Sequence, residues 1–230
     1  MVEAFELIPA DILHVLFDKF PNIPQPLETR GAMNVLMEIA STNPASGTVD
    51  TNGTLPLNQI MEDMLSSAFE DGLVIDATIA ASDAQRQSLW DVRESAPESH
   101  KLSGNVARSD ISLAQSVLAP FYAEMVEGIK EIDPTIWICG YGHLGDGNLH
   151  FNLVEGPSSN SDFHEKVPLL YELLYRNVAK YNGSISAEHG IGQTKRDQLA
   201  NIKSPEIMDT MRAIKTALDP KKLMNPGKVL

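Results

Sequence analysis

The chain has 230 residues, 43% of them hydrophobic and 21% charged, a composition typical of a globular protein with one sizeable domain or two small ones. Its formal net charge of −13 disfavours nucleic acid and anionic membranes as partners, and an anionic substrate would need local cations or a metal ion. With one cysteine, Cys139, and no basic segment before an apolar run at the N-terminus, we expect no intrachain disulfide, no signal peptide and a cytoplasmic location.

Hydrophobic periodicity and turn residues predict helices alternating with short strands in the first half of the chain. Strands are expected at 33–40, 73–79 and 106–113, and the Gly-, Asn-, Ser- and Thr-rich segment 43–55 is expected to be a surface loop. Helices are expected at 9–20, 56–69, 83–102 and 115–131, and Pro97 could break the third of them.

The second half is predicted to contain one hairpin and two further helices. Two apolar strands, 136–141 and 149–154, flank a glycine-rich turn, and a helix at 161–181 follows. A short strand at 184–187 and a last helix at 205–218 precede the tail DPKKLMNPGKVL. This order favours an α+β fold in which helices pack on one side of an antiparallel sheet. A parallel, doubly wound sheet is the alternative, which the lack of a glycine-rich fingerprint after the first strand weakens.

The sequence GYGHLGDGNLHFN at 140–152 brings two histidines close together. The Asp-Gly pair at 146–147 is a strong signal for a two-residue turn, whose type I′ form has positive φ at both positions. In that register His143 lies opposite His150 on one face of the hairpin, with Cβ atoms about 4.5–5.5 Å apart. A single histidine is more often an ordinary surface or half-buried side chain, but this pairing favours a shared metal ion.

A third candidate ligand lies in the sequence SAEHGIG at 186–192. Glu188 and His189 precede two glycines that permit close backbone approach, although a glutamate in the first turn of a helix is an ordinary alternative interpretation. Two histidines and a glutamate with one open position form a recognised catalytic zinc arrangement. Asn152 lies two residues beyond His150 and therefore points to the same face.

Together, GHLGDGNLH and SAEHGIG resemble the paired signatures of the FAD-linked oxidase family, which includes D-2-hydroxyglutarate and D-lactate dehydrogenases and the glycolate oxidase flavin subunit. The tail LDPKKLMNPGKVL and the early segments AFELI, PQPL and MNVLMEIA are similar to the same family, so the resemblance covers nearly the whole chain. It implies that residues 1–230 form the substrate domain of a vanillyl-alcohol-oxidase-type flavoprotein. This domain would have a ferredoxin-like fold, either as a single unit or as two copies of it. It also implies an N-terminal FAD-binding domain that is absent from this chain. The chain would then be an excised domain or a naturally short relative, and we expect the former.

The resemblance is strongest to the D-2-hydroxyglutarate dehydrogenase branch, and it implies a metal centre with a base beside it. His143, His150 and Glu188 would bind a divalent metal, usually zinc, and His189 would be the general base. Such a cation lowers the pKa of a bound hydroxyl, and a neutral imidazole can then take the proton.

The same resemblance implies contacts to substrate and flavin. Arg93, Arg108 and Asn152 would bind the 2-hydroxy-acid substrate, and Asn225 in the tail would contact FAD. From the residues alone, Arg93 is more often an exposed helix arginine, and only the family match favours a carboxylate-binding role.

Three positions depart from the family pattern and bear on the identity of the substrate. Arg108 stands where that branch commonly has lysine, and the two cations are not interchangeable at a shaped site. Pro97 replaces a hydroxyl-bearing residue, and Ala114 replaces a proline. The remaining histidines, His14, His100 and His164, are expected to be solvated.

Two alternatives to the flavoenzyme remain open. One is a zinc hydrolase in which water completes the coordination, although HExxH-type spacing is missing. The other is a non-catalytic module that docks onto a separate flavin subunit and has an exposed apolar face, through which a homodimer could form. The electron acceptor and the choice between dehydrogenase and oxidase depend on the flavin surroundings.

Overall fold

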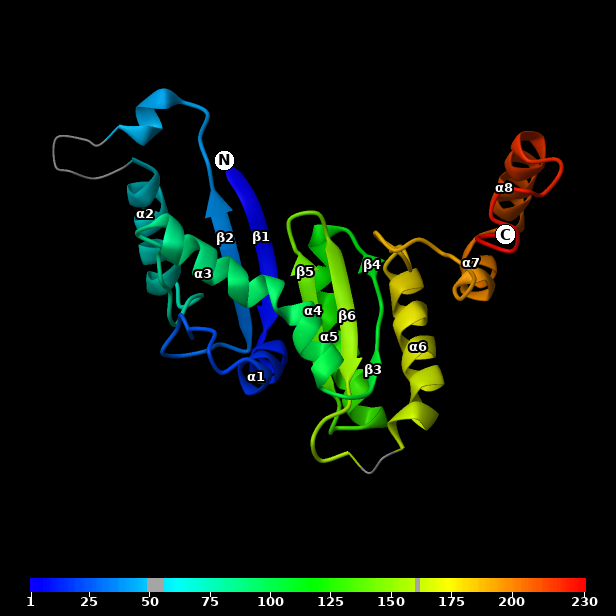
Figure 1. The fold of residues 1–230 in the computed structure, drawn as a ribbon, viewed down its shortest axis with the longest axis horizontal. Coiled ribbons are helices and arrows are strands. Elements are labelled where there is room, and N and C mark those ends of the chain that lie inside the picture. Colours follow the sequence, from blue (N-terminus) through cyan, green and yellow to red (C-terminus); the bar gives the residue numbers. More distant parts are fainter. Residues whose placement is uncertain (49–55, 160–161) are drawn as a thin grey trace.

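The computed structural model describes residues 1–48, 56–159 and 162–230, and its centre is an antiparallel sheet (Figure 1). The strands run in the order β2-β1-β5-β6-β3, and β4 also pairs with β6. Their bounds are β1 Val2–Pro9, β2 Met33–Ile39, β3 Val106–Ala107, β4 Ile111–Ser112, β5 Trp137–His143 and β6 Asn148–Val154. Every pairing is antiparallel, which confirms the predicted α+β class.

Eight α-helices and one short 3-10 helix are present in the described ranges. Four α-helices, α2, α3, α4 and α8, have proline or a serine cap at or near their first turn, which suits the free N–H groups there. The bounds are α1 Ala10–Lys19, η1 Pro44–Gly47, α2 Pro56–Glu70, α3 Asp83–Glu94, α4 Ala96–Leu102, α5 Gln115–Ile132, α6 Phe163–Lys180, α7 Arg196–Ile202 and α8 Pro205–Leu218.

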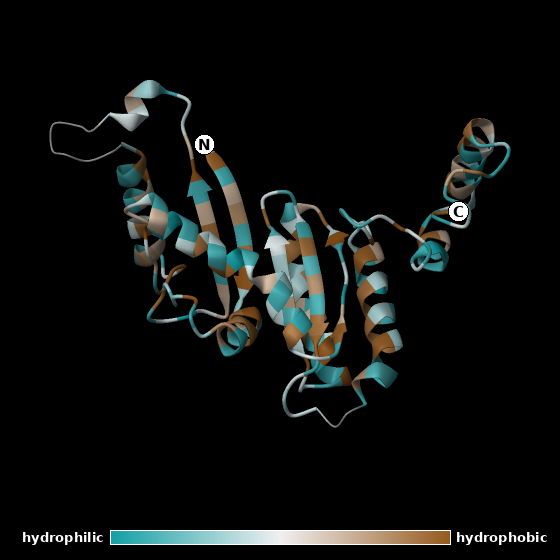
Figure 2. Ribbon diagram, viewed as in Figure 1, coloured by the Kyte–Doolittle hydropathy of each residue, from teal (hydrophilic) through white to brown (hydrophobic). Residues whose placement is uncertain are grey.

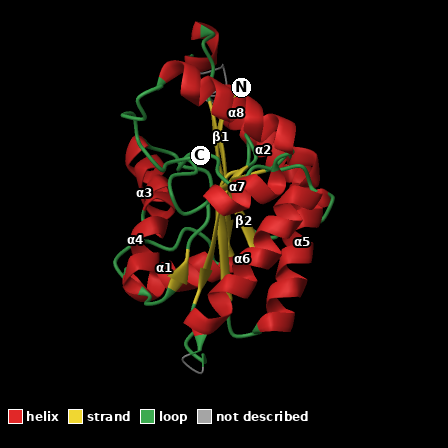
Figure 3. Ribbon diagram, turned by 90° about the vertical axis from the view of Figure 1, so that its right-hand side faces the viewer, coloured by secondary structure: helices red, strands yellow, loops and turns green. Residues whose placement is uncertain are grey.

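Side chains alternate across β5 and β6, so these central strands contribute to two cores. Ile138 and Phe151 belong to the core shared with α5 and α6, where the ring of Phe151 meets Phe121 edge-on at 5.7 Å between centroids. Cys139 and Tyr141 belong to the second core, shared with α1 and the α3–α4 region. Figure 3 shows α5 and α6 on one side of the sheet and α1, α3 and α4 on the other. The sheet therefore has one helical layer on each face, whereas the helices were expected on one side.

The C-terminal helices extend away from the sheet (Figure 1). Helices α7 and α8 each bury one residue, Leu199 and Met208, whereas Ile214 and Leu218 of α8 are more than half exposed, at 55% and 72%. Figure 2 shows hydrophobic residues concentrated on the strands and on the helices that cover them, with further ones along α8. No helix in the described ranges is long and apolar enough to cross a membrane.

Most of the predicted elements are confirmed, but two of the predicted strands do not form. Residues 73–79 form no strand: Leu73 and Ile75 are exposed, and Asp76 instead accepts a hydrogen bond from the Thr29 backbone N–H at 2.8 Å. The predicted strand 184–187 is reduced to one bridge, between Ser112 and Ser184. A strand needs a neighbouring strand to pair with as well as alternating side chains. Sequence periodicity reveals the alternation but not the pairing partner.

Other boundaries differ because a proline or a side chain interrupts the backbone pattern. The helix expected at 83–102 is two helices, with Pro97 in the first turn of α4. The strand expected at 106–113 is divided into β3 and β4, while β1 and α7 were not predicted at all. The expected loop at 43–55 begins with η1, and its remainder at 49–55 lies outside the described residues, as does the predicted helix start at 161.

The predicted register of the β5–β6 hairpin is wrong by two residues. The turn spans 144–147, Tyr141 rather than His143 pairs with His150, and only Gly147 of the Asp-Gly pair has positive φ, at 75°. The turn is longer because the backbone of Gly147 bonds to the chain after β4: its carbonyl accepts the N–H of Leu113 at 3.0 Å. A shift of two residues keeps every side chain on its predicted face, so His143 and His150 remain diagonal neighbours.

We predict that Gly147→Ala destabilises the fold more than Gly104→Ala. Both glycines have positive φ, which costs an alanine about 1–2 kcal/mol. A Cβ at Gly104 meets nothing within 4 Å, whereas one at Gly147 would lie 1.9 Å from the carbonyl oxygen of Leu113, adding an overpacking cost of about 1–3 kcal/mol. Urea unfolding of both variants measures the difference, and equal losses would contradict the close approach.

Candidate functional site

The two histidines of the hairpin lie on one face of the sheet, at the end where β5 turns into β6. His143 is the last residue of β5 and His150 the third of β6, and their ring centroids are 6.2 Å apart. The His143 side chain is 41% exposed and that of His150 is 16% exposed, so both can meet a ligand from solvent. Although the turn is longer than predicted, His143 and His150 therefore still lie close together on one face.

Glu188 lies opposite both imidazoles. Its Oε1 is 3.7 Å from His143 Nε2, and its Oε2 is 3.9 Å from His150 Nε2. Asn148, at the start of β6, donates from Nδ2 to Glu188 Oε1 at 2.7 Å and so steadies the carboxylate. His189 follows directly, and its ring stacks on His150 at 5.7 Å between centroids. The structure thus brings together residues 143, 150, 188 and 189.

A buried carboxylate, Asp110, fixes the segment that carries Glu188 and His189. Its Oδ2 accepts the backbone N–H groups of Ala187, Glu188 and His189 at 3.0, 2.8 and 2.8 Å. Burial opposes the charged form of Asp110, but the hydrogen bonds from His189 and Glu188 outweigh it and lower the pKa of the carboxyl below its usual value. The segment 184–192 has no helix or ladder of its own, so this carboxylate sets its conformation.

The position of Asp110 depends on the gap between β3 and β4. There, Ser109 replaces the sheet ladder with two other bonds: its N–H donates to Asn152 Oδ1 at 3.1 Å and its Oγ to the Phe151 carbonyl at 2.5 Å. Asp110 follows with no exposed surface, and its Oδ1 has no hydrogen-bond partner among the described residues. That oxygen lies 3.9 Å from Nδ1 of His150.

A second buried carboxylate, Glu6 of β1, lies behind His143. Its Oε1 is 2.7 Å from His143 Nδ1, and its Oε2 accepts from Arg93 Nε at 2.8 Å. Arg93 is only 8% exposed and its guanidinium carbon lies 5.0 Å from the centroid of the Tyr141 ring. This ion pair joins β1, α3 and β5 at the site, and its charges compensate each other inside the protein.

Two pairs of donor atoms in this cluster are close enough to share a divalent metal ion. Two ligands of one zinc ion, each about 2.0–2.1 Å from it, lie no more than about 4.2 Å apart, and both histidine–Glu188 distances are below that limit. Among the described residues, the group whose ligand atoms all lie within 4.8 Å of one another is Asp110, His150, Glu188 and His189, and it does not include His143. Imidazole nitrogens with carboxylate oxygens suit zinc and neighbouring transition metals.

The other predicted site residues lie farther from this centre. Asn152 is 5% exposed, and its amide binds Ser109 and, at 3.3 Å from its Nδ2, His100 Nδ1. Arg108 is exposed between β3 and β4, and Asn225 is exposed in the tail. No hydrogen bond or ion pair among the described residues joins the Arg108 or Asn225 side chain to the histidine cluster.

Sequence reasoning missed three residues that organise the cluster, namely Glu6, Asp110 and Asn148. Asp110 lies in the mixed segment ARSDISL, whereas Glu6 carries a charge inside an apolar run, AFELI. A lone acid in such a run is buried at a cost unless it is paired, so it could have been singled out. Asn148 had no comparable signal.

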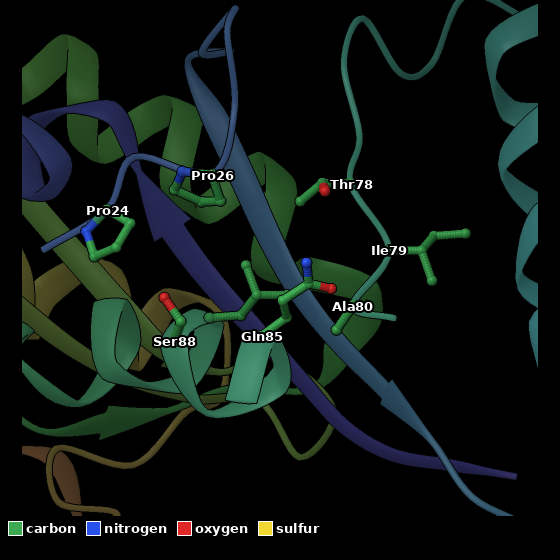
Figure 4. A pocket seen from close by; sticks show the side chains of 8 residues that line it. Pro24, Pro26, Thr78, Ile79, Ala80, Gln85 and Ser88 are labelled. Carbon is green, nitrogen blue, oxygen red and sulfur yellow. The ribbon is translucent and has the colours of Figure 1, made fainter. Parts of the chain in front are cut away.

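The pocket in Figure 4 lies elsewhere, beside the β1–β2 side of the sheet. It has a volume of about 190 Å³ and no titratable side chain in its lining, which is Pro24, Pro26, Thr78, Ile79, Ala80, Gln85, Ser88 and Leu89. We therefore place no chemistry there.

Comparison with known proteins identifies the family of the chain. Residues 18–229 match the sequence pattern of the family described as FAD linked oxidases, C-terminal domain. The chain belongs to this family. It is similar to D-2-hydroxyglutarate dehydrogenase of Stutzerimonas stutzeri, at 34% identity over 90% of this chain and 42% of that protein. The mitochondrial D-2-hydroxyglutarate dehydrogenases of Arabidopsis thaliana and Danio rerio are each 32% identical over the whole chain, covering 38% and 40% of their own lengths. The chain thus spans about two fifths of these relatives.

His100 was predicted to be solvated but is buried, and its burial makes the free energy of unfolding depend on pH. It is 1% exposed, and burial, assisted by the charge of Arg108, lowers its pKa from 6.5 to about 4. Between these values the unfolded chain binds a proton that the folded chain does not, so the free energy of unfolding falls as the pH drops from 6.5 to 4.

We predict that His100→Gln removes part of this dependence, up to about 1.4 kcal/mol per pH unit. Urea unfolding at several pH values measures the slope. His164→Gln, at an exposed position, is the control and should keep the wild-type slope. An unchanged slope in His100→Gln would show that this residue titrates normally.

Proposed function

We propose that this FAD-linked oxidase domain is the substrate- and metal-binding part of a flavin-dependent 2-hydroxy-acid dehydrogenase of the D-2-hydroxyglutarate or D-lactate type. The observation that carries the proposal is the convergence of His143, His150 and Glu188 beside His189, on a chain whose relatives bear the name D-2-hydroxyglutarate dehydrogenase. Both parts are needed, because a histidine–carboxylate cluster alone also suits other metal enzymes.

His143, His150 and Glu188 would hold a divalent cation, with zinc as the leading candidate. When bound, such a cation supplies Lewis acidity that favours deprotonation of a hydroxyl group. It also answers a problem of charge, because a protein of net charge −13 repels an anionic substrate unless positive charge is concentrated locally. Asn148 keeps the Glu188 carboxylate facing the imidazoles.

His189 would take the hydroxyl proton of the substrate. Its side chain lies on the exposed part of the segment 186–189, within reach of a bound molecule, while its backbone is held by Asp110. Stacking on His150 keeps its ring next to the proposed metal ligands. A neutral imidazole in this position is suited to general-base catalysis near neutral pH.

Arg93, Arg108 and Asn152 would bind the anionic substrate. Glu6 takes only the Nε of Arg93, so the Nη donors of the guanidinium remain for a carboxylate. Burial lowers the pKa of His100, the neighbour of Asn152, and the positive charge of Arg108 lowers it further. The free donors of Arg93 and the charge of Arg108 near Asn152 support a substrate-binding role for these residues.

The flavin would be held mainly by an FAD-binding domain outside the 230 residues of this chain and would accept the hydride of the substrate. Asn225 would contact it from the tail. In support, Val229 N–H donates to the Gly192 carbonyl at 2.7 Å, and Arg196 Nη1 donates to the Gly227 carbonyl at 3.3 Å. These bonds tie the tail to the segment that follows His189.

The experiment is to measure flavin reduction by D-2-hydroxyglutarate and D-lactate in the protein joined to its FAD-binding domain. We expect His189→Asn to slow reduction about 100- to 10,000-fold, the usual contribution of a general base. His164→Asn, which alters an exposed histidine on α6, should leave the rate unchanged. A His189 variant at the wild-type rate, or metal-dependent hydrolysis as the main activity, would refute the proposal.

A further inference from the structure

The two imidazoles of the proposed metal centre have the same kind of neighbour at each ring nitrogen. Behind the Nδ1 of each ring lies a buried carboxylate, Glu6 for His143 at 2.7 Å and Asp110 for His150 at 3.9 Å. In front of the Nε2 of each ring lies one oxygen of Glu188. The chain therefore presents the same side of both rings to the site.

We propose that Glu6 and Asp110 are positioning residues that hold His143 and His150 as Nδ1–H tautomers, so that the lone pairs of both Nε2 atoms face Glu188. This inference rests on the proposed function in that it takes the two imidazoles to be cation ligands. It adds two residues to the site, neither of which would touch the cation.

For His143 the hydrogen-bond partners determine the tautomer. A carboxylate only accepts hydrogen bonds, and Arg93 only donates them. Arg93 Nε already donates to one oxygen of Glu6, and the other oxygen must receive its hydrogen from His143 Nδ1. A neutral His143 then has no hydrogen on Nε2, which is the form that binds metal.

For His150 the argument comes from an oxygen without a partner. Three backbone N–H groups occupy Oδ2 of Asp110, whereas its buried Oδ1 lacks a hydrogen bond in the described part of the chain. Nδ1 of His150 lies 3.9 Å from this oxygen, and an approach of about 0.9 Å would bring the pair to ordinary hydrogen-bond length if Nδ1 carries the hydrogen. The bond would remove the cost of a buried, unpaired acceptor.

An amide replacement at either carboxylate should reverse the tautomer. In Glu6→Gln the new oxygen must face Arg93, so the NH₂ group faces His143 Nδ1 and forces its hydrogen to Nε2. In Asp110→Asn the new oxygen must face the backbone N–H groups of 187–189, so the NH₂ group faces His150. Each amide should change only the histidine in front of it.

The test uses ¹⁵N NMR of the ring nitrogens in the metal-free chain at about pH 8, above the reference pKa of about 6.5 for an imidazole. We expect Nδ1–H at both histidines in the wild type, a switch of His143 alone in Glu6→Gln, and a switch of His150 alone in Asp110→Asn. Asp133→Asn is the matched control, because Asp133 is equally buried and bonds to Thr135 and Lys166 instead. The wild-type tautomers decide the question even where a variant fails to fold.

Zinc titration of the same proteins is the second measurement. We expect each amide variant to bind zinc about 10- to 100-fold more weakly, and the Asp133 variant to bind like the wild type. Nε2–H tautomers in the wild type, or unchanged tautomers in folded amide variants, would overturn the proposal. Loss of zinc in Asp110→Asn with an unchanged His150 tautomer would instead make Asp110 a direct ligand and overturn its assignment. Switched tautomers with unchanged zinc affinity would uphold the positioning and refute the proposed metal ligands.

Discussion

The buried carboxylate of Asp110 is the constraint on which the site depends. Glu188 and His189 lie in a segment without helix or ladder, and three hydrogen bonds from its backbone to Asp110 Oδ2 keep it beside β6. Asp110 in turn reaches this position because Ser109 and Asn152 interrupt the sheet between β3 and β4. A local break in regular pairing thus leaves Asp110, between two short strands, as the anchor of a distant segment. Any chemistry at the side chains of Glu188 and His189 therefore depends on this backbone conformation.

The electrostatics of the site differ from those of the whole chain. The protein carries a formal charge of −13, yet two of the three carboxylates beside the histidines are buried and compensated, Glu6 by Arg93 and Asp110 by backbone N–H groups. Glu188 is the exposed acid of the cluster, and it faces two imidazoles. A site of this kind has the donors for a cation without adding several uncompensated charges, which burial would penalise.

The hairpin and its two histidines could be predicted from the sequence because faces follow from a period of two. The error of two residues in its register did not move His143 or His150 to the other face, so the pair survived a wrong turn type. The same reasoning could not find Glu6, since β1 was not predicted, or the distance between Asp110 and residues 187–189, which depends on tertiary contacts. His100 was expected in solvent and is buried, because a short helix after Pro97 turns it inward. Local patterns thus predicted which residues share a face but not which distant segments meet.

Metal content of the purified chain tests the central claim, that His143 and His150 with Glu188 form a cation site. Elemental analysis should find zinc or a similar divalent metal at close to one ion per chain. In the His143→Ala/His150→Ala double variant, metal should fall to background, while His14→Ala/His164→Ala, which changes two exposed histidines elsewhere, should keep it. No bound metal in the wild type after loading, or equal metal in the double variant, would contradict the account.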